Sequence, residues 1–435
     1  MLAVIFAARR RTGQLELEAV ETLVRDSMHR AGASALTRLL STAGGHGPET
    51  SCNCGRSARY HDMRSKQLLT VLGPVLIQRA YYVCSFCHCG HTPLDRELDV
   101  GGTECSPGVR RMMAMVGSET SFDQGREQLE LLAGIKVTAK AVERHAEAIG
   151  ADIEACAQTA IRGVKQLELS DVCASAVPIL YIEMDGTGVP MVKAETAGRT
   201  GKVEGQPPQT REVKLGCVFT QTVTGQKSRP VRDAASTSYV AAIETAEQFG
   251  LRLYTEAWRR GWNRAAKKVV IGDGAVWIWN LADQHFPSAI QIVDLYHARE
   301  HLWELSIQLF VNDDKARKRW IARCLDQLDR GKIETLVRAL RDFHPDHPDL
   351  VKIVANAAEY FERNAERMRY PVFRAQGLFV GSGVIEAGCK TVIGKRLKCS
   401  GMFWTVRGAN AIIALRCSRL SRTFEDYWAS RSQVA

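Results

Sequence analysis

Residues 178–190 of this 435-residue chain read PILYIEMDGTGVP. An apolar run ending at Met184 leads into one acid, Asp185, and Gly186-Thr187-Gly188 follows it. This pattern predicts a buried strand that carries a carboxylate at its C-terminal end and then turns sharply. Because a lone buried carboxylate is costly, we expect the rest of the chain to supply a partner or a metal.

Two later apolar runs also end in an acid: VVIG precedes Asp273, and IQIV precedes Asp294. From residue 178 we predict three strands, helix, strand, helix, strand, helix, with the first helix from Ser236 to about Arg260. Neighbouring strands that end in acids would place Asp185 and Asp273 side by side.

A third acid, Glu386, is predicted on a helix that Gly381 and Gly383 open. Residues 386–435 hold nine Lys or Arg against three acids, and the whole chain carries a net charge of +10. A carboxylate among cations fits a metal site that faces phosphates. The residues predicted to contact DNA here are Lys390, Lys395, Arg396, Lys398, Trp404 and Arg407. Phe403 and Trp303 are further candidates for stacking on bases, although such residues more often pack a core.

Residues 52–95 hold a cysteine cluster: Cys52-x-Cys54, then Cys84-x-x-Cys87. Two alternating runs between these pairs predict a β-hairpin, so the pairs lie on turns that flank it. This is a zinc-ribbon pattern with four thiolates around one structural Zn²⁺. The first pair has one intervening residue where two are usual, so His61, Cys89 or His91 are alternative ligands. Reduced free cysteines are the other interpretation.

Residues 104–165 predict helices, one ending near Ala133-Gly134 and the next starting with Thr138 as its N-cap. Helix, short turn and second helix is the helix-turn-helix layout. Lys136, Lys140 and Arg144 would face outward, toward DNA. A plain helical hairpin with solvated lysines would look the same. The first fifty residues predict an amphipathic packing helix, to which we assign no chemistry.

Composition excludes several classes. No run approaches the ~20 apolar residues of a membrane span. The apolar N-terminal run has its basic residues behind it, unlike a secretory signal, so we expect a cytoplasmic protein. No Walker-type glycine loop is present, so no nucleotide cofactor is expected. His297-Ala-Arg-Glu300-His301 matches a zinc-peptidase signature, but nothing else supplies a peptidase context.

Four blocks carry a resemblance: YIEMDGTGVPM, VVIGDGAVWIWN, VDLYHAREHLWEL and GSGVIEAGCKTVIGKRLKCSGMFWTVRGANAIIALR. Together they resemble bacterial insertion-sequence DDE transposases of the ISKra type, relatives of the Mutator-like group. The resemblance implies an α/β RNase H-like catalytic core with an all-α insertion, preceded by the zinc-ribbon-like module and the helical DNA-binding region. The implied segments are 1–50 (N-terminal helical), 51–102 (zinc-ribbon-like), 103–176 (helix-turn-helix-like), 177–301 (core, first part), 302–376 (insertion) and 377–435 (core, last part).

The implied chemistry is DNA cleavage and joining by Asp185, Asp273 and Glu386 with two Mg²⁺ ions, or Mn²⁺ in their place. Asp294 and His297 resemble an element beside that triad. The implied partner is double-stranded DNA, bound by a homodimer or a larger assembly. Glu183 and Glu300 are nearby alternative acids, and Glu183 is expected on the opposite face of its strand. The rival functions are a nuclease or resolvase without strand transfer, and a catalytically inactive DNA-binding protein.

Overall fold

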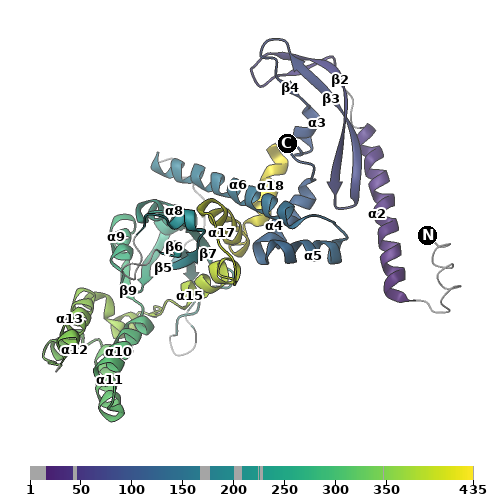
Figure 1. Cartoon of the computed structure of the whole chain (residues 1–435). Coiled ribbons are helices and arrows are strands. Elements are labelled where there is room, and N and C mark those ends of the chain that lie inside the picture. The colour runs from purple at the N-terminus through teal and green to yellow at the C-terminus, as the bar shows by residue number, and fades with distance from the viewer. Residues whose placement is uncertain are drawn as a thin grey trace. The chain divides into compact units, whose positions relative to one another are not determined.

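A computed structural model describes residues 16–42, 47–166, 177–199, 208–223, 225, 229–345 and 347–434. The chain forms two compact units (Figure 1), Met1–Ile149 with Phe424–Ala435, and Gly150–Thr423. The apolar N-terminal run lies outside the described residues. Within the described ranges, no helix is both long and apolar enough to cross a membrane.

The first unit is built on an antiparallel sheet in the order β1-β2-β3-β4. Its strands are β1 (Glu49–Ser51), β2 (Ser57–Thr70), β3 (Gly73–Cys84) and β4 (Gly90–His91). The long pair β2–β3, joined at Thr70 and Gly73, confirms the predicted hairpin.

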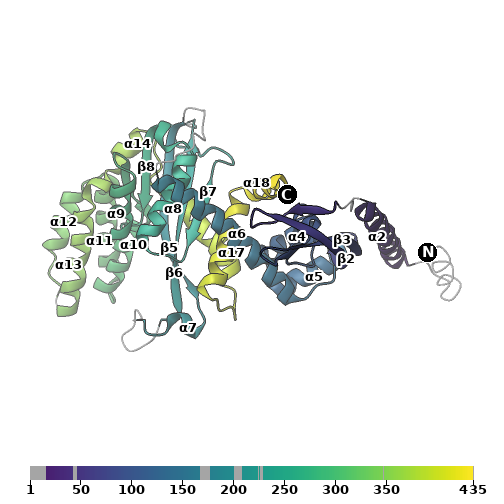
Figure 2. The ribbon, with the colours of Figure 1, turned by 90° about the horizontal axis from the view of Figure 1, so that it is seen from above.

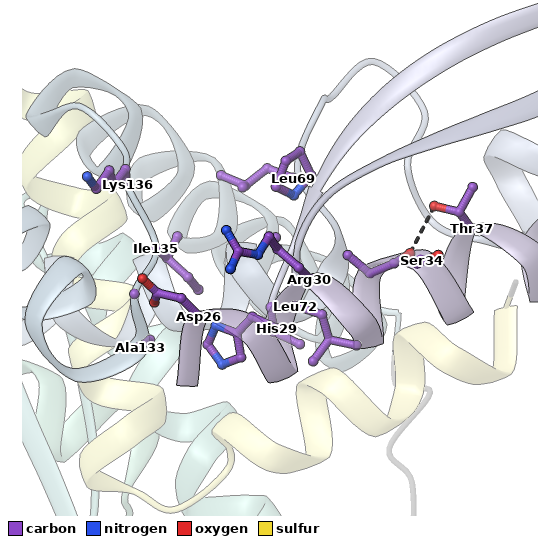
Figure 3. A pocket seen from close by; sticks show the side chains of 15 residues that line it. Asp26, His29, Arg30, Ser34, Thr37, Leu69, Leu72, Ala133, Ile135 and Lys136 are labelled. Atoms are coloured by element: carbon purple, nitrogen blue, oxygen red, sulfur yellow. Dashed lines mark hydrogen bonds between the residues drawn. The ribbon is translucent and has the colours of Figure 1, made fainter. Parts of the chain in front are cut away.

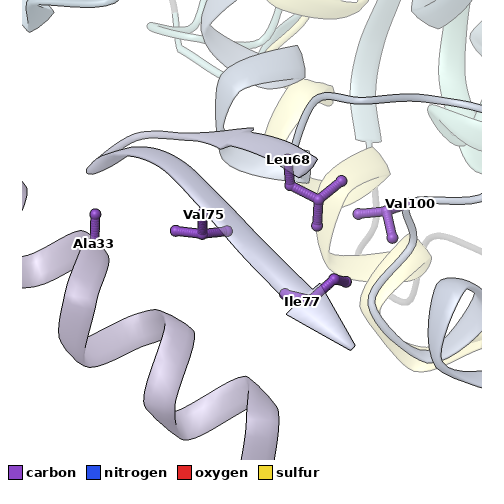
Figure 4. Close-up of a cluster of buried hydrophobic side chains, with 5 residues drawn as sticks. All are labelled: Ala33, Leu68, Val75, Ile77 and Val100. Atoms are coloured by element: carbon purple, nitrogen blue, oxygen red, sulfur yellow. The ribbon is translucent and has the colours of Figure 1, made fainter. Parts of the chain in front are cut away.

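Helix α2 (Leu17–Thr42) covers this hairpin. Ala33 points from α2 toward Val75 of β3 (Figure 4), in a buried cluster completed by Leu68, Ile77 and Val100. The helix, the hairpin tip and the turn after α5 line a cavity of about 680 Å³, into which His29 and Arg30 project (Figure 3).

The first unit contains further helices, of which α4, α5 and the start of α6 pack on a second buried cluster around Met113 and Val142. These further helices are α3 (Pro93–Glu97), α4 (Pro107–Glu119), α5 (Phe122–Ala133), the start of α6 (Ala139–Lys165) and α18 (Phe424–Val434). Helix α5 ends at Gly134, whose φ of 67° is left-handed, and Thr138 accepts a hydrogen bond from the Ala141 N–H. The two predicted helices and the turn between them are therefore confirmed.

The second unit contains a five-stranded mixed sheet in the order β7-β6-β5-β8-β9. The strands are β5 (Val177–Pro190), β6 (Thr210–Gln221), β7 (Ser238–Ala242), β8 (Ala265–Gly272) and β9 (Ile290–Val293). Strand β6 is antiparallel to both neighbours, and β8 and β9 run parallel to β5. The central strand is buried on both faces, because Tyr181 and Ile182, which point to opposite faces, are both 0% exposed.

The second unit also contains helices on and beside this sheet (Figure 2). They are α7 (Lys193–Thr196), α8 (Ala246–Arg259), η2 (Trp262–Arg264), α9 (Val276–His285), α10 (Leu295–Leu309), α11 (Asp314–Asp329), α12 (Ile333–Arg341), α13 (Pro348–Arg363), η3 (Ala365–Met368), α14 (Tyr370–Ala375), α15 (Gly383–Gly388), the π-helix η4 (Cys389–Gly394), α16 (Lys395–Leu397) and α17 (Val406–Leu420). Residues 302–376 are helical as predicted, and η3 contacts the edge strand β9.

Two details of this unit differ from the sequence prediction. The predicted sharp turn at Gly186–Gly188 is wrong, because β5 continues through it, paired with β6 as far as Pro190. A Cβ at Gly186 would lie 2.6 Å from an oxygen of Glu212, so the glycine permits close cross-strand packing instead of a turn.

The predicted helix from Ser236 is also wrong at its start. Residues 238–242 form β7, and α8 begins only after Thr245, which makes a capping box with Gln248. Tyr239 and Val240 suit a strand, and pairing with β6 outweighs the helical spacing that suggested one long helix.

The buried centre of β5 gives a stability prediction. Ile182→Ala should lower the free energy of unfolding by about 2–5 kcal/mol, because it leaves a cavity in a packed core. Ile307→Ala, which truncates a side chain that is 54% exposed on α10, should change it by about 0.5 kcal/mol or less. Urea unfolding of both variants measures the difference; equal losses would contradict the assigned burial.

Candidate functional site

Three acids lie at one edge of the five-stranded sheet. The parallel pairing of β5 with β8 ends at Glu183 opposite Ile271, so Asp185 and Asp273 both lie just beyond it. Asp294 follows β9 in the same way. Parallel strands end at a common edge, which is why three acids far apart in the sequence are gathered there.

Asp185 is half-buried, and each of its oxygens accepts a hydrogen bond. Oδ1 accepts from the Gly186 N–H at 2.6 Å, and Oδ2 accepts from the Cys389 thiol at 3.2 Å. Burial raises the pKa of Asp185, and the charge of Asp273 adds to the rise, while Cys389, Gly186 and His297 oppose it. Burial and the nearby Asp273 therefore disfavour the ionised form of Asp185.

Asp273 is held in a tight loop. Its Oδ1 accepts from the Ala275 N–H at 2.8 Å, and Gly274 has a φ of 101°. The Tyr360 hydroxyl, from α13, donates to the Asp273 backbone carbonyl at 2.9 Å. The Tyr360 ring also contacts the His301 ring, tilted by 39° with centroids 4.5 Å apart. Helix α13 thus fixes the loop that presents this acid.

Glu183 corrects a sequence expectation. It was expected on the face of β5 opposite Asp185, but residues two apart in a strand share a face. Its side chain is fully buried and accepts from the Ile385 N–H of α15 at 2.8 Å. Burial raises the pKa of Glu183 to about 8. The sequence contained the signal for this placement, because Glu183 lies two residues before Asp185 and therefore shares its face of the strand.

Glu386 lies exposed on α15, which the preceding contacts fasten to β5. The Cys389 thiol donates to Asp185, and besides burial the charges of Asp185 and Glu386 both raise the pKa of Cys389. Among the described residues, however, Asp185, Asp273 and Glu386 do not form a group whose ligand oxygens all lie within 4.8 Å of one another.

Asp294 and His297 are placed at the start of α10. Asp294 is buried, and its Oδ1 accepts from the N–H groups of Tyr296 at 2.6 Å and His297 at 3.4 Å. Its Oδ2 accepts from the N–H of Ser382, at 3.0 Å, and from the Ser382 hydroxyl. Asp294 therefore ties α10 to the segment that leads into α15.

The peptidase signature receives no support from the geometry. The rings of His297 and His301 lie 4.7 Å apart, and His297 Nδ1 is 3.5 Å from Glu300. Within the described part of the chain, these three residues do not form a ligand group closed within 4.8 Å.

The predicted DNA-contacting residues of the second unit divide into two groups. Those with exposed side chains are Lys390, Lys395, Lys398 and Arg407. The Lys398 ammonium donates to the Thr187 hydroxyl, two residues past Asp185 on β5. A cation therefore lies beside the acidic edge of the sheet.

Arg396 and Trp404 are corrections to that prediction. Arg396 is 1% exposed and Trp404 is 7% exposed. The guanidinium lies 5.0 Å from the Trp404 ring centroid, and the indole N–H donates to the Leu397 carbonyl at 3.1 Å. Residue 404 also pairs with the backbone of Pro190 and Val192. The two side chains therefore pack in the interior, while the backbone of residue 404 joins the segment after α16 to the end of β5.

In the first unit, Lys136, Lys140 and Arg144 are all exposed. Lys136 lies 3.7 Å from Glu130, and Lys140 lies 2.8 Å from Glu143. These are weak surface pairs that a phosphate can displace, so the proposed DNA-contacting role of the three residues stays open.

Four cysteines form a second candidate site, within the first unit. The sulfur atoms of Cys52, Cys54, Cys84 and Cys87 all lie within 4.8 Å of one another. Cys52 and Cys87 are 3.5 Å apart, and Cys54 and Cys84 are 3.7 Å apart. Four thiols at these distances could hold a zinc ion, and they are the predicted four.

The short Cys52-x-Cys54 spacing is explained by its turn. The Gly55 N–H donates to the Cys52 carbonyl at 2.9 Å, with a Gly55 φ of 82°, and the Cys52 N–H donates to the Arg56 carbonyl at 2.7 Å. Because glycine adopts this left-handed conformation without steric cost, the turn that carries Cys52 and Cys54 is compatible with one intervening residue in place of the usual two.

The thiol cluster favours deprotonation at two of its members, because backbone N–H groups lower the pKa of both Cys84 and Cys87. The pKa of Cys87 is lowered to about 6, first by the backbone N–H of Cys89 and then by the hydrogen bond with Cys52. For Cys52, the Cys54 N–H acts to lower the pKa, but burial and the neighbouring thiols together raise it to about 12. Neighbouring thiols thus disfavour ionisation of Cys52. A bound cation would relieve this effect, because it stabilises the thiolate form of its ligands.

The thiol cluster predicts that the purified protein binds about one Zn²⁺ per chain. Cys84→Ser should lose the metal and lower the melting temperature, because zinc binding is coupled to folding. Cys89→Ser, a change at an exposed neighbour outside the cluster, should keep the metal. Elemental analysis after gel filtration reports the content. Zinc lost in Cys89→Ser and kept in Cys84→Ser would contradict this ligand set.

Comparisons with known proteins give a similarity to solved structures alone. No protein-family model matches the chain, and no curated protein sequence matches it. Among solved structures, the chain is similar to the Drosophila P element transposase in its strand transfer complex, with 10% sequence identity and a TM-score of 0.23. The match covers 74% of this chain and 79% of that one.

Proposed function

We propose that this protein is a DNA transposase of the DDE type, with Asp185, Asp273 and Glu386 as its catalytic acids. The observation that carries the proposal is the attachment of the Glu386 helix to the strand of Asp185. Glu183 accepts from α15 at 2.8 Å, and Asp185 accepts from Cys389 at 3.2 Å. Glu183 and Asp185, two residues apart on β5, thus hold the segment that carries Glu386.

The topology supports an RNase H-like core. The first three strands form an antiparallel meander. The fourth strand, β8, pairs with β5 in parallel, and the fifth, β9, pairs with β8 in parallel, which gives the order β7-β6-β5-β8-β9. The resemblance of the four sequence blocks to ISKra-type transposases implies this core, with acids after its first and fourth strands and on a late helix. We infer the family from those blocks.

The residues of the site fit divalent cations with hard character. Carboxylate oxygens are the ligands that Mg²⁺ prefers, and Mg²⁺ keeps several waters, so three acids that are not tightly closed suffice. The exposed Glu386 side chain is able to reorient. Bound Mg²⁺ would activate the attacking oxygen and stabilise the leaving one.

The chain's own residues position the substrate in this scheme. Lys398, beside Thr187, and the exposed Lys390, Lys395 and Arg407 bind the DNA backbone. Asp294 fixes the start of α10, and with it His297, near the scissile phosphate. Water attacks a phosphodiester at the transposon end, and the freed 3′-hydroxyl then attacks target DNA, releasing one target strand end for each bond formed.

The test is a plasmid that carries this coding region with its native flanking DNA, incubated with the purified protein and Mg²⁺. We expect cleavage at two fixed sites outside the coding region and joining of the freed ends to a second plasmid. Asp185→Asn, Asp273→Asn and Glu386→Gln should each lower cleavage by roughly 100-fold or more, since groups that only orient metal ligands already cost 10–100-fold.

Asp342→Asn, a change at an exposed acid at the end of α12, is the matched control and should keep full activity. Cleavage without joining, also when precut ends are supplied, would favour a nuclease or resolvase. DNA binding without cleavage would favour an inactive DNA-binding protein. Unreduced cleavage by all three variants would refute the assigned site.

A further inference from the structure

The helix that carries Glu386 contains a π-helical segment. Helix α15 continues through η4 into α16, since Gly388 and Gly394, at the two junctions, both have helical φ and ψ angles. The Lys395 N–H donates to the Lys390 carbonyl, five residues earlier, whereas an α-helix places the acceptor four residues earlier. The π segment therefore accommodates about one residue more than an α-helical turn does.

This extra residue rotates the residues that follow it around the helix axis. At about 100° per residue, a continuous α-helix would place Lys398 about 120° away from Glu386 and would place Lys395 on the opposite side. With about one residue taken up by the π segment, these angles fall to about 20° for Lys398 and about 80° for Lys395. The π segment thus turns both lysines toward the side of the helix that carries the carboxylate.

Contacts with β5 agree with this rotation. Asp185 and Thr187 share one face of the strand, because they are two residues apart. Asp185 accepts from the Cys389 thiol, at the start of the π segment, and Thr187 accepts from the Lys398 ammonium, beyond its end. In an uninterrupted α-helix, Lys398 would lie about 180° around the helix from Cys389 and would point away from β5.

A buried arginine holds the π segment. Arg416 lies on α17, which contacts η4 (Figure 1), and it is 2% exposed. Its Nε donates to the Val392 carbonyl at 2.7 Å, and its Nη2 donates to the Thr391 carbonyl. One planar guanidinium therefore spans two successive carbonyls of η4, which suits the rigid fork of an arginine. Because a buried cation is costly unless its donors are bonded, this contact favours one geometry of the segment.

We propose that Arg416 is a positioning residue for DNA binding. By holding the π segment, it turns Lys395 and Lys398 toward the DNA strand at the catalytic acids. The inference rests on the proposed function, because it takes these lysines as phosphate contacts. Glu386 precedes the π segment, and the N–H of its neighbour Ile385 is bonded to β5. Loss of the arginine should therefore displace the lysines and leave the carboxylate in place.

The first test measures how the full-length protein binds a labelled duplex of its native flanking DNA over a range of KCl concentrations, without divalent cations. Each phosphate contact that is lost reduces the slope of log affinity against log salt by about one. Lys398→Ala should therefore reduce the slope by about one, and Arg416→Met by about two, because both lysines turn away. Adding Lys398→Ala to Arg416→Met should reduce it no further.

Additive effects of the two changes would overturn the inference, and so would an unchanged slope in Arg416→Met. Leu336→Ala truncates a side chain in α12 that is 0% exposed, so it controls for lost stability and should leave the slope unchanged. If circular dichroism shows that Arg416→Met does not fold, Arg416→Lys takes its place, since it keeps the charge and loses the fork. Lys398→Ala should then have a smaller effect than in the wild-type protein, and an undiminished effect would overturn the inference.

The second test separates positioning from a general structural role. In the plasmid cleavage assay, Arg416→Met should raise the KM for DNA. The Mg²⁺ concentration that gives half-maximal cleavage should stay the same, because the three carboxylates keep their places. A higher Mg²⁺ requirement with an unchanged KM would overturn the inference.

The two tests also distinguish this inference from the proposed function. A wild-type protein that does not bind the duplex would refute both. A wild-type protein that binds the duplex but does not cut DNA would refute the catalytic proposal alone, and the salt dependence would still decide the role of Arg416. Cleavage with additive salt effects would refute the positioning role alone.

Discussion

The structure of the second unit depends on how one strand holds one short helix. Strand β5 carries Glu183 and Asp185 on the same face, and both side chains accept hydrogen bonds from the segment that contains Glu386. Burial makes both carboxylates hard to ionise there, with the pKa of Glu183 raised to about 8. One oxygen of Glu183 accepts from a backbone N–H of α15, whereas its Oε1 is buried with no hydrogen-bond partner; Asp185 lies at the open edge of the sheet.

Elements far from the acids also stabilise this edge. The Tyr360 hydroxyl of α13 donates a hydrogen bond to the backbone carbonyl of Asp273. Asp294, at the start of α10, accepts a hydrogen bond from the Ser382 N–H. In the basic segment after Glu386, the buried guanidinium of Arg396 packs on the ring of Trp404, whereas the lysines of this segment are exposed. In the first unit, where the hairpin core is small, the four cysteines fasten the turns at one end of the sheet.

Much of this could be predicted from local patterns. Apolar runs that end in Asp185 and Asp273 predicted strands with acids at one edge, and cysteine spacing predicted the thiol cluster. The errors arose where tertiary contacts decide. Gly186 serves close strand packing rather than a turn, and strand pairing prevents the residues around Tyr239 from extending α8. Burial of Trp404 depends on a backbone segment over two hundred residues earlier in the chain, which no local pattern reports.

The central claim is that β5, the loop after β8 and α15 converge on one divalent-cation site. Replacing Mg²⁺ by Fe²⁺ with ascorbate and peroxide generates radicals that cut the backbone near the bound metal, and mass spectrometry locates the cuts. The account predicts cuts near residues 185, 273 and 386 together, all suppressed by excess Mg²⁺. Cuts confined to one of these segments, or centred on His297 and His301 alone, would contradict it.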